Sequence, residues 1–102
     1  MKLREIAHSR AGDKGNTSNL SLIVFRAEDY ERIRSQITAE RVKALFADIV
    51  RGDVVRYELP LIGALNFVLH DALGGGVTRS LSLDAHGKSL SSALLDMEIS
   101  DG

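Results

Sequence analysis

The chain contains no cysteine and no tryptophan, and it has a single proline among its 102 residues. The absence of cysteine excludes disulfide bonds, a thiolate nucleophile and a zinc–thiolate centre. A domain of this size without such cross-links depends on its hydrophobic core, or on apolar surface that it buries against a partner. Because a chain of this length holds one core rather than two, we expect residues 1–102 to form a single domain.

Long hydrophobic runs are also missing. The longest apolar stretch, residues 59–69, is interrupted by Pro60, Gly63 and Asn66, so it falls short of the roughly 20 apolar residues of a membrane-spanning helix. The first residues, Met1–Glu5, lack the apolar centre of a secretory signal. These absences predict a cytoplasmic domain without a membrane segment.

The charged residues show no excess of either sign, since 13 Lys and Arg residues stand against 14 Asp and Glu residues. Nucleic-acid binding normally needs a basic surface. Aromatic side chains on which single-stranded bases could stack are scarce as well, with three Phe and two Tyr. We therefore expect no nucleic-acid partner.

The first half of the chain alternates between strand and helix patterns. A short strand is predicted over residues 2–8, followed by a polar loop over 9–17 that contains two glycines. Residues 20–25 are apolar and partly β-branched, which predicts a buried strand. Apolar residues at helical spacing then predict two helices, over 27–37 and 38–50.

The second half of the chain also shows strand and helix patterns. Residues 54–59 alternate and predict a strand that ends at the only proline, with Tyr57 directed towards the core. Helical spacing predicts a helix over 63–73, which three consecutive glycines terminate. A strand is predicted over 77–83, and a closing helix over 90–97 completes the chain, with a hairpin return as the alternative.

This order of elements favours an α+β fold over a doubly wound sheet, because strands and helices do not alternate strictly. We predict a small mixed or antiparallel sheet with its helices mainly on one face. Since the other face of such a sheet stays uncovered in so small a protein, the pattern also predicts a homo-oligomer.

The densest group of chemically active residues lies in the predicted loop after the first strand. Its members are Arg10, Gly12, Asp13, Lys14, Gly15 and Asn16. Glycines can turn successive backbone N–H groups towards one anion, and Arg and Lys are suited to a carboxylate or a phosphate. The alternative is a tight loop in which Asp13 pairs with Arg10 or Lys14 and fixes the turn.

Asn66 and His70 form a second candidate group, because residues four apart share one face of the predicted helix. The pair could orient a substrate carbonyl, with His70 as acid or base. The alternative is a hydrogen-bonded histidine at the sheet edge. The three histidines are too scattered in sequence for a metal site, so we predict no metal and no cofactor. Arg56 is a candidate for contacting a ligand or a partner chain.

Several segments resemble one known family, the AtuA-like ferredoxin-fold domain of acyclic terpene utilisation. Residues 7–16, AHSRAGDKGN, resemble its signature A-H-x-R-[SA]-G-D-K-G-[ND]. Residues 56–60 and 64–70 resemble a second block, and residues 73–81 with Asp84, Gly87 and Lys88 resemble a third. The blocks follow the expected order and cover nearly the whole chain.

The resemblance implies a ferredoxin-like α+β fold and, from the chain length, the stand-alone form of the domain. It also implies a link to the catabolism of acyclic terpenes or other branched acyl-CoA compounds. It carries over no catalytic residue, but it favours a ligand site over a fixed turn. The implied ligand-binding residues are Arg10, Gly12, Asp13, Lys14, Gly15, Asn16, Asn66 and His70.

Three functions are compatible with this pattern. The first is a ligand-binding or accessory subunit for an acyl-CoA or carboxylate metabolite, working as a homo-oligomer or docked to a larger AtuA-type subunit. The second is a small hydratase, lyase or isomerase with His70 or Asp13 as base and Lys14 or Arg10 stabilising an enolate. The third is a structural protein-interaction domain.

Overall fold

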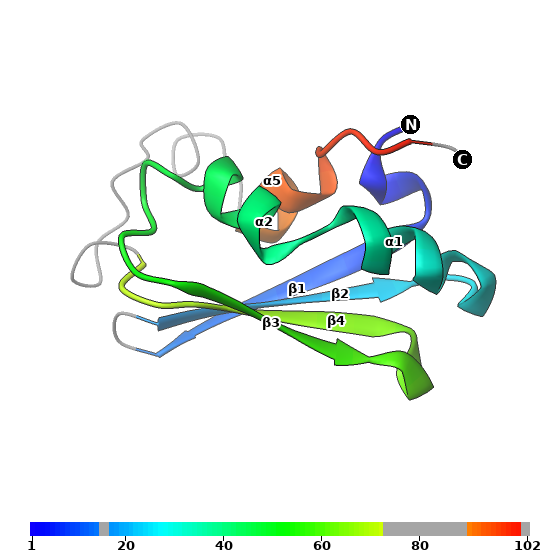
Figure 1. Cartoon of the computed structure of the whole chain (residues 1–102), viewed down its shortest axis with the longest axis horizontal. Helices are drawn as coiled ribbons and strands as arrows, with labels where there is room; N and C mark the ends of the chain where they lie inside the picture. Colours follow the sequence, from blue (N-terminus) through cyan, green and yellow to red (C-terminus); the bar gives the residue numbers. More distant parts are fainter. Residues whose placement is uncertain (15–16, 73–89, 101–102) are drawn as a thin grey trace.

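The fold is a four-stranded antiparallel sheet covered by helices on one face, as the computed structural model in Figure 1 shows. The structure describes residues 1–14, 17–72 and 90–100, and for residues 13 and 14 it describes the backbone. The strands are β1 (Ala7–Lys14), β2 (Thr17–Val24), β3 (Val54–Leu59) and β4 (Ala64–Leu69). Their order across the sheet is β1-β2-β4-β3, and each neighbouring pair is antiparallel.

The helical layer lies on one side of this sheet (Figure 1). It contains α1 (Tyr30–Gln36), α2 (Ala39–Leu45) and α5 (Leu90–Leu95), with short 3-10 turns η1 (Leu3–Glu5) and η2 (Ala27–Asp29) beside them. A third turn, η3 (Pro60–Ile62), connects β3 to β4. Thr38 begins α2, because its side chain accepts a hydrogen bond from the Arg41 backbone N–H.

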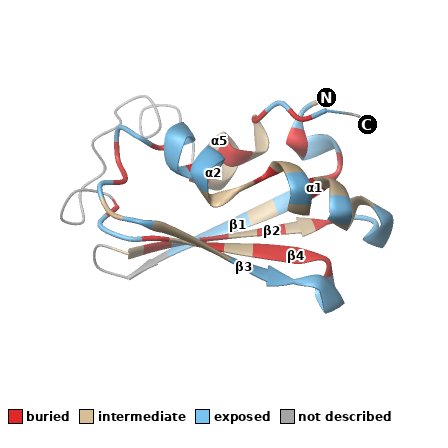
Figure 2. Cartoon of the chain, in the orientation of Figure 1, coloured by how far each residue is buried: buried red, intermediate tan, exposed pale blue. Residues whose placement is uncertain are grey.

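The core fills the space between the sheet and the helices (Figure 2). Alternate residues of the two central strands point into it and are fully or almost fully buried: Leu20, Leu22 and Val24 from β2, and Leu65, Phe67 and Leu69 from β4. Ile33, Val42 and Leu94 close it from α1, α2 and α5. Because burying apolar surface is the main stabilising term in folding, these two strands determine which face of the sheet the helices cover.

The ends of the described chain are joined to each other. The Met1 amino group donates to the Ile99 carbonyl (3.0 Å), and the Ile99 N–H donates to the Met1 carbonyl (2.8 Å). The Leu3 N–H donates to the Met97 carbonyl (2.9 Å). The first and last segments therefore lie together in the helical layer.

Much of the predicted architecture is confirmed. The chain is α+β with its described helices on one face of the sheet, and the described strands are wholly antiparallel. The strands predicted over 20–25 and 54–59 and the helices predicted over 27–37 and 90–97 all have counterparts at those positions. The strand predicted over 77–83 lies outside the described residues.

The helix predicted over 63–73 is wrong, because that segment is β4. Leu65 and Leu69 suit both a helical and a strand spacing, so they did not distinguish the two. Phe67 does, since it is buried together with them at a period of two. The segment pairs with β2 on one side and β3 on the other, and this tertiary pairing outweighs the local helical pattern.

Three boundaries also differ from the prediction. Most of the polar loop predicted over 9–17 is strand, because β1 runs over Ala7–Lys14, and much of the strand predicted over 2–8 is the turn η1. The helix predicted over 38–50 stops at Leu45. A polar sequence such as that of β1 is compatible with a strand because one face of this antiparallel sheet is not covered by helices.

A close approach of two backbones fixes the identity of Gly52. A Cβ at this position would lie 2.7 Å from the His70 carbonyl oxygen and 3.0 Å from its carbonyl carbon. We expect Gly52→Ala to destabilise the fold by about 1–3 kcal/mol, since one of the two backbones must move. In a thermal melt followed by circular dichroism the Tm should fall by roughly 5–10 °C.

Gly12→Ala is the matched control, because a Cβ there would meet nothing within 4 Å. An unchanged Tm for Gly52→Ala would contradict this packing.

Candidate functional site

The candidate site lies on the face of the sheet opposite the helices, which we call the open face. Strand alternation assigns its residues: His8, Arg10 and Gly12 from β1; Asn19, Ser21 and Ile23 from β2; Ala64, Asn66 and Val68 from β4; Val55, Tyr57 and Leu59 from β3. The described elements leave this face uncovered (Figure 2).

The strand register places four polar side chains in one line across the open face. Arg10 is opposite Ser21, Ser21 is opposite Asn66, and Asn66 is opposite Tyr57. We call these four residues the polar row. Because neighbouring strands lie about 4.8 Å apart, the backbones of Arg10 and Asn66 are about 10 Å apart with one strand between them. A small polar group can therefore contact both side chains at once.

The donors of the polar row are available to a ligand. Within the described part of the chain, neither the Arg10 guanidinium nor the Asn66 amide has a hydrogen-bond or ion-pair partner. Arg10 is exposed and Asn66 is half-buried. The guanidinium presents a planar fork of N–H groups that matches a carboxylate or a phosphate in two parallel hydrogen bonds. The row is thus chemically suited to an anion.

Gly12 leaves a bare area of backbone beside the polar row. It is opposite Asn19 in the register, and a Cβ added to it would have no neighbour within 4 Å. Its carbonyl oxygen accepts a hydrogen bond from the Ser18 hydroxyl (3.2 Å). A ligand can approach the backbone more closely here than over any residue that carries a side chain.

The structure separates His70 from this row. The His70 N–H donates to the Asp53 carbonyl (2.9 Å), and its own carbonyl accepts from the Gly52 N–H (3.0 Å). These bonds continue the pairing of β3 and β4 beyond their ends, so His70 is exposed on the same side as Asn66. Four residues along a strand span about 13 Å, whereas a helix would have brought the two side chains to about 6 Å.

The remaining predicted residues are described only in part. Asp13 and Lys14 belong to β1 and pair through their backbones with Ser18 and Thr17. Gly15 and Asn16 lie outside the described residues. Gly12 sits within the strand rather than in a turn, so the predicted loop does not begin before the end of β1. Ligand binding by these residues stays a prediction.

Tyr57 was missed as a site residue. It was predicted to point into the core, but it is on the open face and 53% exposed. The strand pattern of 54–59 was correct, and only the choice of its buried side was wrong. The sequence held a signal for the buried side of this strand. The side opposite Tyr57 carries Arg56 and Glu58, whose long side chains can reach past the apolar layer to bond with the helices.

Arg56 occupies that other side and has a structural role. Its Nη1 donates to the backbone carbonyls of Arg34 (2.7 Å) and Ile37 (2.9 Å), which belong to the end of α1. Its Nη2 pairs with Glu58 (3.0 Å). A cation at this position satisfies helix carbonyls that have no partner within the helix. The candidacy of Arg56 as a contact for a ligand is therefore not supported.

The charges around Arg56 also affect a tyrosine in the helical layer. Burial raises the pKa of Tyr30, and the negative charge of Glu58 acts in the same direction. The nearby Arg34 side chain pairs with Glu31 and holds the pKa of that carboxyl below its usual range. This group lies on the helix side of β3, away from the polar row.

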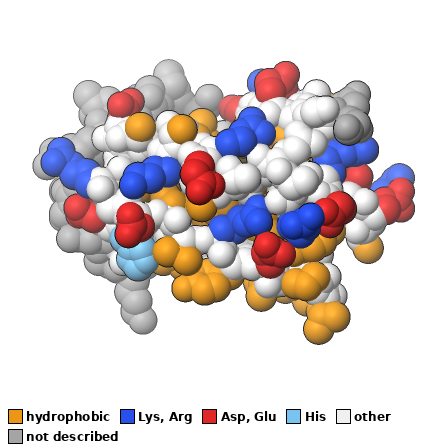
Figure 3. All heavy atoms as spheres, viewed as in Figure 1, with side chains coloured by type: hydrophobic (Ala, Val, Ile, Leu, Met, Phe, Trp, Pro, Cys, Tyr) orange, Lys and Arg blue, Asp and Glu red, His pale blue; other side chains and the backbone are white. Residues whose placement is uncertain are grey.

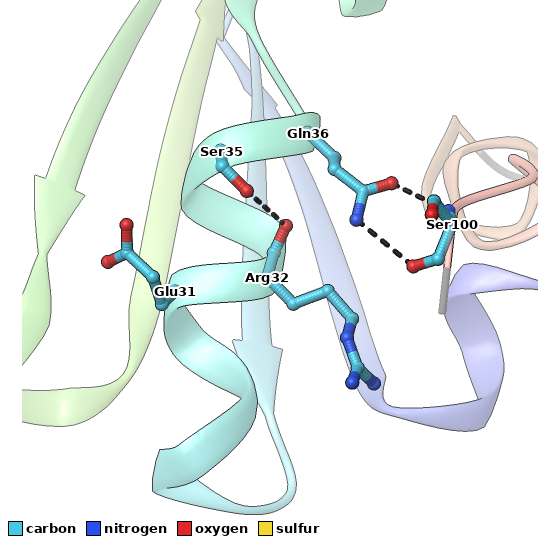
Figure 4. Close-up of a pocket in the computed structure, with 5 residues that line it drawn as sticks. All are labelled: Glu31, Arg32, Ser35, Gln36 and Ser100. Carbon is cyan, nitrogen blue, oxygen red and sulfur yellow. Dashed lines mark hydrogen bonds between the residues drawn. The ribbon is translucent and has the colours of Figure 1, made fainter. Parts of the chain in front are cut away.

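A depression of about 490 Å³ lies elsewhere, between α1 and the C-terminal segment (Figure 4). Its central polar groups are bonded to each other: the Gln36 amide donates to the Ser100 carbonyl (3.0 Å) and accepts from the Ser100 N–H (2.7 Å). Arg32, also on its lining, pairs with Asp29 (3.4 Å). These bonds attach the C-terminal segment to α1. We therefore interpret the depression as part of the packing between these two segments.

Residues 1–14, 17–72 and 90–100 contain neither a cluster of metal ligands nor a membrane-spanning helix. No three His, Asp or Glu side chains in these ranges lie close enough together to hold a metal ion. No helix in them has the length and apolar composition needed to cross a membrane.

Comparison with known proteins gives one match. The family model of the AtuA ferredoxin-like domain matches residues 1–100, which is almost the whole chain. No curated protein matches the chain, and no solved structure does. The predicted family resemblance is confirmed, and the ferredoxin-like α+β fold with it.

Proposed function

This chain belongs to the AtuA ferredoxin-like domain family, and we propose that its open face binds a carboxylate metabolite or its acyl-CoA ester. One observation carries the proposal: Arg10 and Asn66 lie in one row of an uncovered sheet face, and their polar groups have no partner among the described residues. Arg56, by contrast, bonds to two backbone carbonyls of its own chain.

The rows beside the polar row supply the other features of such a ligand. On one side, Gly12 offers bare backbone against which a head group can lie. On the other, Ile23 is opposite Ala64, which in turn is opposite Leu59. Ala64 is already buried, but Ile23 is half-buried and Leu59 is exposed. An aliphatic chain attached to the anionic group can extend over these two side chains, because covering them removes apolar surface from water.

We infer the wider role from the family. We place the ligand among the branched acids and acyl-CoA esters of acyclic terpene catabolism, and we place the domain in the cytoplasm as an accessory subunit that docks to a larger AtuA-type subunit. The match to the family supports this placement. Binding is favoured over catalysis because His70 lies about 13 Å along the strand from Asn66, too far for both to contact one reacting group.

Calorimetric titration of the purified chain tests the proposal. Branched free acids and their CoA esters are compared with a neutral amide of the same carbon skeleton. We expect the charged ligands to bind and the amide to bind at least tenfold more weakly, since it cannot form the charge-assisted pair with Arg10. Equal binding of the amide, or no binding by a folded sample, would overturn the proposal.

The same samples separate binding from catalysis. If the chain were a hydratase or isomerase, it would convert the ester during the titration, and His70→Ala or Asp13→Asn would stop the conversion without lowering the Tm. We expect no turnover by the isolated chain. Mass spectrometry of the recovered ligand provides the measurement.

A further inference from the structure

One end of the open face carries an apolar surface that overlaps the polar row only at Tyr57. We call it the apolar tip, and its members are Phe25, Tyr57, Leu59, Leu61 and Ile62. These side chains are 62%, 53%, 42%, 100% and 65% exposed, respectively. Figure 3 shows hydrophobic side chains gathered along the lower side of the molecule, where the open face lies.

The apolar tip draws its residues from two parts of the sequence that a backbone hydrogen bond joins. The Val24 N–H donates to the Gly63 carbonyl (3.0 Å), which brings the end of β2 against the end of η3. Phe25 and Ile62 are the chain neighbours of the two residues that this bond joins. Tyr57 and Leu59 alternate on the open side of β3 immediately before η3.

The size of this surface lies at the upper end of what a typical monomer exposes. A fully exposed bulky side chain presents about 170 Å², so the exposed fractions of the five residues correspond to roughly 550 Å². The largest apolar patch of a typical monomer is about 300–600 Å² and is often functional. A standard interface buries about 800 Å² on each partner, so the apolar tip supplies about two thirds of one.

The chemistry of the surface selects its partner. None of its five members is charged, and the turn η3 that links them consists of Pro60, Leu61 and Ile62. A two-fold contact sets the same patch against itself, which brings like charges together unless the patch is neutral. A neutral apolar patch avoids this repulsion and can pair with a second copy of itself, whereas a surface for a charged partner would carry the opposite charge. We propose that the apolar tip is the contact surface of a homodimer.

Two features prepare this surface for association. The Phe25 ring stacks on the His8 ring with centroids 5.4 Å apart and planes 19° apart, so its position is fixed before a partner arrives and less entropy is lost on binding. Leu61 projects fully into solvent from a turn that Pro60 stiffens. Such a side chain can pack against the surface of the second copy.

The dimer proposal does not depend on any ligand, although the apolar tip shares Tyr57 with the polar row and Leu59 with the proposed path of the ligand's aliphatic chain. Arg10, Gly12 and Asn19 are outside the apolar tip. Failure of ligand binding and failure of dimerisation are therefore separate results, since the oligomeric state is measured without ligand.

Sedimentation velocity of the full chain at 1–100 µM tests the proposal. We expect the wild-type chain to be dimeric at the upper end of this range, and Leu61→Asp to raise the dimer dissociation constant at least tenfold. The matched control is Leu45→Asp, which places the same charge on an exposed leucine of α2 in the helical layer. It should leave the dissociation constant unchanged, and thermal melts check that each variant is folded.

A second variant tests the two-fold geometry directly. Because the chain has no cysteine, Leu61→Cys introduces a single thiol, and mild oxidation should link two chains through it, while Leu45→Cys should stay unlinked. A wild-type chain that is monomeric at 100 µM overturns the proposal. This is the result expected if the apolar tip binds a different protein. A dimer that Leu61→Asp does not weaken also overturns it.

Discussion

Replacing Arg10 by alanine should weaken carboxylate binding by roughly a hundredfold, or about 3 kcal/mol. The side chain is exposed on the open face and bonds to no described residue, so its removal costs the fold little. A ligand carboxylate would lose two parallel charge-assisted hydrogen bonds. Calorimetric titration gives the dissociation constant, and a thermal melt gives the stability of the same sample.

Two companion variants sharpen this result. Arg10→Lys keeps the positive charge but lacks the planar fork, so it should recover only part of the affinity. Arg26→Ala removes an exposed arginine outside the sheet and should leave the affinity within twofold of the wild type. If Arg26→Ala weakened binding as much as Arg10→Ala, the interaction would reflect net charge rather than a site at the polar row.

Gly12→Val should weaken ligand binding at least tenfold while leaving the fold intact or more stable. A strand glycine costs conformational entropy, and a β-branched residue favours strands. Since a Cβ at Gly12 would contact nothing in the chain, the valine should raise the Tm slightly. Its methyl groups would, however, occupy the space in which the ligand head group lies against the backbone. We expect at least a tenfold loss of affinity.

The value of this variant is that stability and binding move in opposite directions. Gly12→Ala provides an intermediate step, with a smaller loss of affinity and a smaller gain in Tm. A purely structural glycine would produce the reverse pattern, with a lower Tm for both variants. Unchanged affinity in Gly12→Val, measured on a folded sample, would show that the ligand does not lie over β1.

The sequence was sufficient to predict the layer arrangement of the fold. The apolar residues of β2 and the alternation of β3 are local patterns, and they were assigned correctly as strands. The error over residues 63–73 has a physical cause, because Leu65 and Leu69 fit either periodicity. Only the pairing of β4 with strands on both sides decides for the strand, and pairing between distant segments is not visible in a local pattern.

The candidate site was predicted in composition but not in geometry. Arg10 and Asn66 do share a surface, yet they do so as residues of two strands separated by β2, not as a loop against a helix. The error for β4 also affects the predicted partnership of Asn66 with His70, since the rise per residue in a strand is more than twice that in a helix. The exposure of Tyr57 depends on which side of β3 faces the helices, and the charged residues Arg56 and Glu58 on that side were the signal available in the sequence.

The joined ends of the chain have a practical consequence for linking it to anything else. Met1 and Ile99 exchange two backbone hydrogen bonds within the helical layer, so a tether attached at the amino end departs from the side of the molecule remote from the polar row. A sensor surface, a fluorophore or a covalently fused domain can be attached there without blocking access to the open face. An amino-terminal extension turns the Met1 amine into an amide, which keeps one N–H to donate to the Ile99 carbonyl.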